Sequence, residues 1–112
     1  METITLNELL SIARLNAEGF TIDKYGNAIN KGMACAVTNG KEDFNTASVG
    51  EVYTMVMNSD ELVFGGWYDT KENVYYLDAV KILPVNNAAM NFARIHKQRS
   101  VFILDSNTLI EL

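Results

Sequence analysis

The residues most able to do chemistry in this chain are scattered, and they complete no known catalytic or metal-binding pattern. The chain has one histidine, His96, and one cysteine, Cys35. A single histidine cannot build a histidine-based metal site, and the carboxylates show no ligand spacing. The sequence contains no phosphate-loop, dinucleotide-binding, serine-hydrolase or zinc-protease motif. We therefore expect a protein that is not an enzyme and that binds no metal and no cofactor.

Cys35 lies in the apolar run MACAV, residues 33–37. Free cysteines are among the most buried residue types, so this run predicts a buried thiol in a reducing compartment. A nucleophilic cysteine is the alternative. That role needs a histidine or a cationic partner, and the sequence shows none near Cys35.

Basic residues cluster around the single histidine: Arg94, Lys97 and Arg99 flank His96. They follow a predicted helix, and positive charge at that end compensates the helix dipole. The alternative is a contact with a phosphate or an acidic partner. Of the two interpretations, we favour compensation of the dipole.

The stretch GGWYDTKENVYYLD, residues 65–78, holds the only tryptophan and three of the five tyrosines. Two interpretations are open. The aromatic side chains could pack across a hairpin, or they could form an exposed patch of the kind that dominates protein interfaces. The glycine pair at its start indicates a bulge or a close approach of the backbone rather than a phosphate site.

We expect both roles to occur within this stretch. Tyr76 and Trp67 are predicted to be mainly structural, and Tyr68, Asp69 and the 70–73 loop to be exposed. A carboxylate inside an apolar strand, as at Asp78, must be hydrogen-bonded, paired or at the rim of the sheet. The candidate binding residues are Trp67, Tyr68, Asp69, Lys71, Glu72, Tyr75 and Asp78.

Two strand patterns position these residues. Residues 62–68 and 74–83 flank a polar five-residue loop, 69–73, and predict a β-hairpin. Side chains alternate along a strand, and both faces of this hairpin are rich in apolar groups. We therefore expect a central pair of strands that is covered on both sides. Pro84 ends the second strand.

Capping boxes predict the first two helices. TLNE at residues 5–8 forms the start of a predicted helix over 6–18, which Gly19 is expected to end. SVGE at residues 48–51 forms the start of a second predicted helix over 49–58. The second segment is also rich in β-branched and aromatic residues, so a strand is the alternative there.

The rest of the chain predicts a third helix and short strands. Asn86 is the expected N-cap of that helix, with Val85 and Met90 placed for a hydrophobic staple. Short strands are predicted at 20–23, 33–38, 101–104 and 109–110. Turns are predicted at 24–27 and 39–40. The fold class is α+β: a mostly antiparallel sheet of about five strands with two to three helices on one face. One strand–helix–strand unit, 74–104, is predicted to be a right-handed parallel crossover.

Bulk composition limits the class of protein. A chain of 112 residues with 48% hydrophobic residues is expected to form a single domain. It opens with no signal-peptide pattern, and no apolar run reaches the roughly 20 residues that span a bilayer. We expect a soluble, cytoplasmic protein with no membrane contact. The net charge is −5, which argues against direct nucleic-acid binding and suits a basic protein partner.

The segment 62–105 carries a further, loose pattern. A GGW strand with an acid is followed by a YYLD strand, an alanine-rich helix, and a glutamine before a last strand that ends in aspartate. In this pattern the chain resembles small uncharacterised proteins of bacteriophages and of conjugative elements of gut bacteria. The residues that carry the resemblance are Gly65, Gly66, Trp67 and Asp69, then Tyr75, Tyr76, Leu77 and Asp78, then Ala88, Ala89 and Ala93, and finally Gln98, Val101, Phe102 and Asp105.

The resemblance implies a mobile genetic element as the setting rather than an activity. Small acidic proteins of such elements are often inhibitors of host defence, similar to anti-CRISPR or antirestriction proteins. We therefore expect a binding protein that blocks the surface of a host or phage protein, such as a nuclease complex. The alternatives are a small accessory or regulatory protein, then a small enzyme, and a homodimer is left open.

Overall fold

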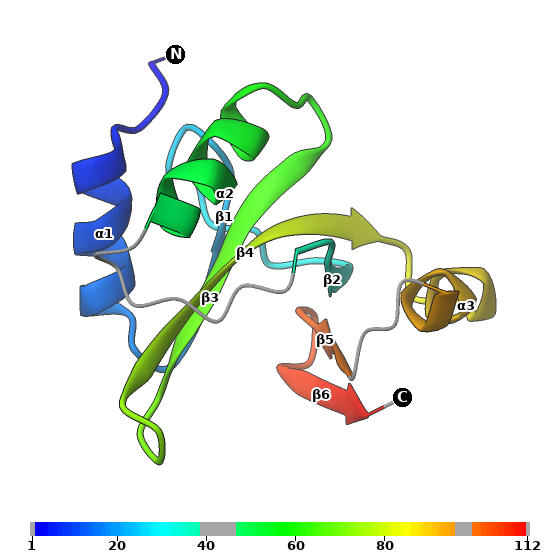
Figure 1. Cartoon of the computed structure of the whole chain (residues 1–112). Coiled ribbons are helices and arrows are strands. Elements are labelled where there is room, and N and C mark those ends of the chain that lie inside the picture. The colour runs from blue at the N-terminus through cyan, green and yellow to red at the C-terminus, as the bar shows by residue number, and fades with distance from the viewer. Residues whose placement is uncertain (1, 39–46, 96–99, 112) are drawn as a thin grey trace.

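The computed structural model describes residues 2–38, 47–95 and 100–111, in which three helices and a six-stranded sheet are present (Figure 1). The predicted α+β class is confirmed, with six strands in place of about five. The helices are α1 (Leu6–Leu15), α2 (Ala47–Met57) and α3 (Asn87–Ile95). The strands are β1 (Phe20–Ile22), β2 (Met33–Ala36), β3 (Leu62–Asp69), β4 (Val74–Leu83), β5 (Ser100–Ile103) and β6 (Thr108–Glu111).

The strands lie in the order β1-β3-β4-β2-β5-β6, and each of these neighbouring pairs is antiparallel. Because β4 and β5 are both antiparallel to β2, they run parallel to each other with β2 between them. The parallel orientation predicted for the two strands of the 74–104 unit is therefore confirmed. Its two strands are not neighbours, because the earlier strand β2 is inserted between them.

All three helices lie on one face of the sheet, as predicted. Phe64 pairs with Ala79 across β3 and β4, and Met33 pairs with Leu83 across β2 and β4. Directly paired residues point to the same side, and so do residues four apart on one strand. These four residues therefore share a face, which we call the helix face.

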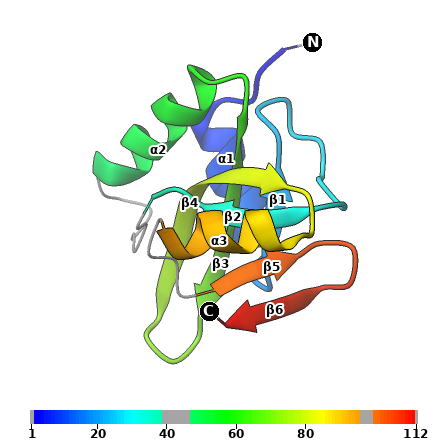
Figure 2. The same cartoon turned by 90° about the vertical axis from the view of Figure 1, so that its right-hand side faces the viewer.

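Two core clusters fill the helix face at either end of the sheet (Figures 1 and 2). Helices α1 and α2 pack over β1, β3 and β4, and α3 packs over β2 and β5. The first, which we call the α1–α2 cluster, contains Ile4, Leu9, Ala13, Ile22, Val49, Val52, Val56, Phe64, Leu77 and Ala79. The second, which we call the α3 cluster, contains Met33, Cys35, Ala89, Ala93, Val101 and Ile103.

Helix α1 begins as predicted and ends earlier than predicted. The Thr5 hydroxyl oxygen accepts the Glu8 N–H at 3.1 Å, and the Glu8 carboxylate accepts the Thr5 N–H at 3.0 Å. At the other end the Asn16 amide donates to the Ile12 carbonyl at 2.8 Å. Asn16 is the C-cap, so the prediction that the helix continues to residue 18 and is ended by Gly19 is wrong. A side-chain amide that binds a last-turn carbonyl ends the helix locally.

Helix α2 is confirmed over its strand alternative, because Val49, Val52 and Val56 bury one helical face. It begins at Ala47, so Ser48 is its second residue rather than the N-cap that the sequence predicts. For α3, the predicted N-cap is confirmed: the Asn86 side-chain oxygen accepts the Ala89 N–H at 2.9 Å.

The β3–β4 hairpin is confirmed, with register pairs from Leu62↔Lys81 to Asp69↔Val74. Asp69 is the last residue of β3 rather than the first of the loop. Asn73, in the left-handed region with φ 53, completes the connection. The predicted 24–27 turn is also present: the Asp23 carboxylate accepts the Tyr25 and Asn27 N–H groups at 2.9 Å. The 39–40 turn, His96, Lys97, Gln98 and Arg99 lie outside the described residues.

No helix in the described part of the chain is long and apolar enough to cross a membrane.

Cys35 is buried in the α3 cluster, as predicted. Burial raises the pKa of the Cys35 thiol, which disfavours the reactive thiolate. We expect slow reaction with a disulfide reagent in the native protein and fast reaction in denaturant. Stopped-flow labelling with and without urea measures both rates. Equally fast labelling in the two states would restore the nucleophile interpretation.

Gly66 allows the backbone of β4 and the ring of Phe20 to lie closer to β3 than any side chain at this position would permit. A Cβ there would lie 2.6 Å from the Tyr76 carbonyl oxygen and 2.7 Å from the Phe20 ring. We expect Gly66→Ala to lower the free energy of unfolding by about 1–3 kcal/mol, because the backbone of β4 cannot move away freely. Urea denaturation measures the change.

Gly50 provides the matched control, since a Cβ at this position of α2 meets nothing within 4 Å. Gly50→Ala is expected to raise the free energy of unfolding by up to about 1 kcal/mol, through helix propensity alone. A Gly66→Ala protein as stable as Gly50→Ala would contradict the close packing of β1, β3 and β4.

Candidate protein-binding surface

The stretch 65–78 divides its side chains between the two faces of the sheet. Trp67 pairs with Tyr76, and Tyr68 pairs with Tyr75. Alternation from Phe64 puts Tyr68 and Tyr75 on the helix face and Trp67 and Tyr76 on the other, which we call the opposite face. The seven candidate residues therefore do not form a single patch.

Trp67 is the large side chain that the opposite face exposes at the hairpin. Its ring is stacked on the Tyr76 ring, with centroids 4.9 Å apart and planes at 7°. Trp67 keeps 47% of its surface exposed, whereas Tyr76 is half-buried. The expectation that Trp67 is mainly structural is wrong, because the described helices all pack on the other side of the sheet.

Tyr68 and Tyr75 have structural roles. Both are half-buried, their rings are 4.6 Å apart, and Tyr75 packs on the α1–α2 cluster. The Tyr68 hydroxyl donates to the Asn73 side chain at 3.0 Å, and its N–H donates to the Ala17 carbonyl at 2.9 Å. The expectation of an exposed Tyr68 is therefore wrong, because its ring lies on the helix face.

The carboxylate of Asp69 holds the hairpin turn. Its Oδ1 atom accepts the N–H groups of Lys71 at 2.9 Å and Glu72 at 3.3 Å. The side chains of Lys71 and Glu72 are exposed, as expected of the 70–73 loop, whereas Asp69 is half-buried. Glu72 also accepts the Tyr76 hydroxyl at 3.4 Å, which connects the turn to the aromatic pair.

Asp78 is hydrogen-bonded, which is one of the three arrangements expected for it. The Thr38 hydroxyl donates to the Asp78 carboxylate at 3.0 Å, and the same hydroxyl oxygen accepts the Ala79 N–H at 3.0 Å. Thr38 thus extends the β2–β4 pairing beyond the end of β2. Asp78 has a structural role, and it is half-buried.

The opposite face also contains residues that the sequence did not single out as binding residues. Ala34 pairs with Ile82 on one side and with Phe102 on the other, and Phe102 pairs with Leu109. Leu109 is 59% exposed. Apolar side chains therefore run along this face, and Val80, which is buried, Ile82 and two alanines lie between Trp67 and Phe102. The sequence signal that could have identified this end of the face is the pair of apolar residues Phe102 and Leu109 in the 101–110 segment.

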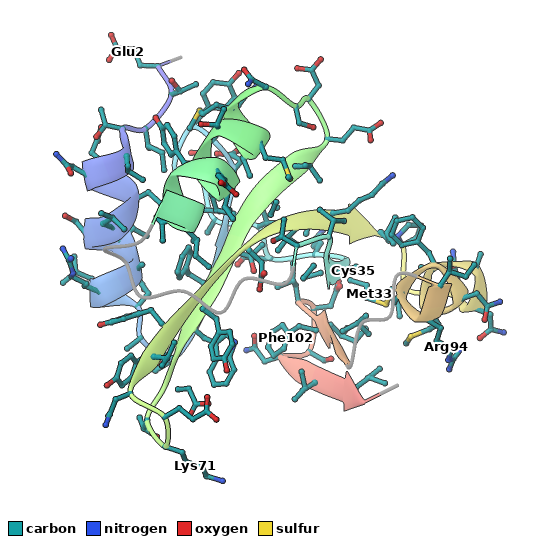
Figure 3. All side chains as sticks on the ribbon, in the orientation of Figure 1. Glu2, Met33, Cys35, Lys71, Arg94 and Phe102 are labelled. Carbon is teal, nitrogen blue, oxygen red and sulfur yellow. The ribbon has the colours of Figure 1, made fainter. Side chains whose placement is uncertain are left out.

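The sheet bends so that the opposite face is on the inside (Figure 1). Helices α1 and α2 lie outside the β3–β4 hairpin, and α3 lies outside β5 and β6. Phe102 is on the hairpin side of β5, whereas Met33 and Cys35 are on the side of α3 (Figure 3). Phe102 therefore projects toward the inside of the bend, on the same face of the sheet that carries Trp67.

The charge of this face is negative. Among the described strand residues, the opposite face carries Asp69 and Asp78 and no lysine or arginine. The described part of the chain also contains no group of three or more His, Cys, Asp or Glu side chains that could hold a metal ion. The geometry suits contact with an apolar or cationic surface rather than with phosphate groups.

Comparisons of the chain with protein-family models, with curated proteins and with solved structures each return no match. The resemblance to phage and conjugative-element proteins accordingly stays a prediction from the sequence pattern.

Trp67 and Phe64, three residues apart on β3, are expected to differ sharply in their importance for stability. Phe64 is fully buried, so Phe64→Ala should cost about 3–5 kcal/mol of unfolding free energy. Trp67→Ala should cost about 1 kcal/mol, since it removes a half-exposed stacked ring. Urea denaturation of both variants checks this. Equal losses would show that Trp67 belongs to the core.

Proposed function

We propose that this chain is a non-enzymatic binding protein of a phage or other mobile element that inhibits a host defence complex. It acts by covering a protein surface, as anti-CRISPR or antirestriction proteins of the blocking type do. The single observation that carries the binding role is the half-exposed Trp67, stacked on Tyr76 at the end of a well-paired hairpin.

A stacked tryptophan on a rigid strand is a suitable binding residue. Tryptophan and tyrosine bury much surface while losing few rotamers, and they are enriched among interface hot spots. The hairpin holds Trp67 in place through eight register pairs between β3 and β4. Little conformational entropy remains to be lost when a partner binds.

The charge of the chain supports the choice of partner. Host nucleases bind nucleic acid and so carry basic surfaces. The net charge of −5 favours encounter with such a surface. The acidic residues are dispersed and not in runs. This distribution favours blocking of a protein surface over imitation of the nucleic-acid backbone.

The proposal predicts a partner that depends on Trp67. Tagged protein is incubated with lysate of the host, and retained proteins are identified for the unaltered chain and for Trp67→Ala. We expect a nuclease complex to be retained, and Trp67→Ala to weaken its binding by at least about 30-fold, the loss typical of a hot spot. Nuclease activity, assayed with each protein added, should fall only with the unaltered chain.

Tyr25→Ala is the matched control, because Tyr25 is an exposed aromatic in the loop after β1. It should retain the complex as the unaltered chain does. Retention of only a second copy, or of a protein of the mobile element, would contradict inhibition and support an accessory role. Equal loss with Tyr25→Ala would contradict the assignment to the opposite face.

A further inference from the structure

The ring of Trp67 has one covered side and one available side. Tyr76 covers the first, with the two rings almost parallel at 7° and 4.9 Å between centroids. The β1–β3 register puts Gly19 beside Trp67 on the other flank, since Phe20 pairs with Gly66. A Cβ at Gly19 would lie 4.0 Å from the Trp67 Cβ, and glycine supplies no side chain to cover the ring.

One carboxylate contacts this aromatic pair, and two further acidic residues lie close to it along the strands and the chain. Glu72 accepts the Tyr76 hydroxyl, and Asp69 follows Trp67 two residues later on the same face of the sheet. Glu18, which is exposed, directly precedes Gly19. Lys71 is the basic residue of the hairpin turn. The residues that flank Trp67 in the chain and in the register therefore carry more negative than positive charge, and this balance favours a cation over an anion.

We propose that the available side of Trp67 receives the guanidinium group of an arginine on the partner protein. This inference rests on the proposed binding function and specifies the chemistry that the partner must present. A guanidinium is flat, stacks on an indole ring and keeps its N–H donors free for a nearby carboxylate. A lysine ammonium gains the same charge attraction without the planar stacking. A nucleobase would bring phosphate groups toward Asp69 and Glu72.

Trp67 is the only tryptophan in the chain, so its fluorescence reports directly on the site. The probe is a blocked Gly-Arg-Gly peptide, titrated at low ionic strength. The comparison peptides replace arginine with citrulline, which has the same shape without the charge, or with lysine. Free N-acetyltryptophanamide, titrated in parallel, measures collisional quenching.

We expect saturable quenching by the arginine peptide, and affinity about two- to fivefold higher than for the citrulline and lysine peptides. The double variant Glu18→Gln/Glu72→Gln, which keeps the size of both side chains, should weaken arginine-peptide binding about two- to fourfold. The matched control is Glu51→Gln, on the exposed side of α2, which should change nothing. High salt should remove the preference for arginine over citrulline.

Three results would overturn the inference. These are quenching by the three peptides that matches free N-acetyltryptophanamide, equal affinity for arginine and citrulline, and equal weakening by Glu51→Gln. None of them would affect the proposed function, which is tested separately by loss of the retained complex in Trp67→Ala. If Trp67→Ala retains that complex while the arginine peptide still binds the unaltered chain, Trp67 is not the residue that binds the complex, and the arginine site remains as a site of its own. If only a second copy or a protein of the mobile element is retained, the proposed function falls instead.

Discussion

Burial of Phe64 is the constraint on which the rest of the structure depends. Its ring lies in the α1–α2 cluster, stacked near Tyr53 at 6.0 Å between centroids, and the Tyr53 hydroxyl donates to the Ile4 carbonyl. A slip of one residue in β3 would move Phe64 to the wrong face of the sheet and lose several kcal/mol of burial. The hairpin register is therefore fixed from the inside, and every other side chain of β3 follows from it.

The two faces of the hairpin consequently have different roles. Tyr68 and Tyr75 help to close the core, whereas Trp67, an odd number of residues from Phe64, must project from the opposite face. Close packing at Gly65 and Gly66 brings β1 and β4 against β3 and makes this scaffold stiff. A binding residue on such a scaffold is positioned without the entropy cost of ordering a loop.

The carboxylates of the sheet and its turns have mostly structural partners. Asp69 holds the turn, Asp78 binds Thr38, and Asp105 accepts the Gly32 N–H at 2.8 Å to connect the β5–β6 turn with the start of β2. Asp69 and Asp78 still contribute negative charge to the opposite face. Under the proposed function the aromatic pair supplies the contact area, so recognition of a partner is expected to depend on shape and stacking, with charge selecting a cationic group.

The sequence by itself determined the local elements: the bounds of β4, the Thr5 and Asn86 helix caps, the hairpin and the burial of Cys35. These depend on residues close in the chain, whose spacing and hydrogen bonds are visible in the sequence. Only the tertiary structure decided which face of the hairpin the helices cover. Both faces of β3 and β4 are apolar in the sequence, so Trp67 and Tyr68 exchanged their expected roles. The Thr38–Asp78 bond joins residues 40 apart, and no local pattern can specify a partner that the packing of distant strands brings into place.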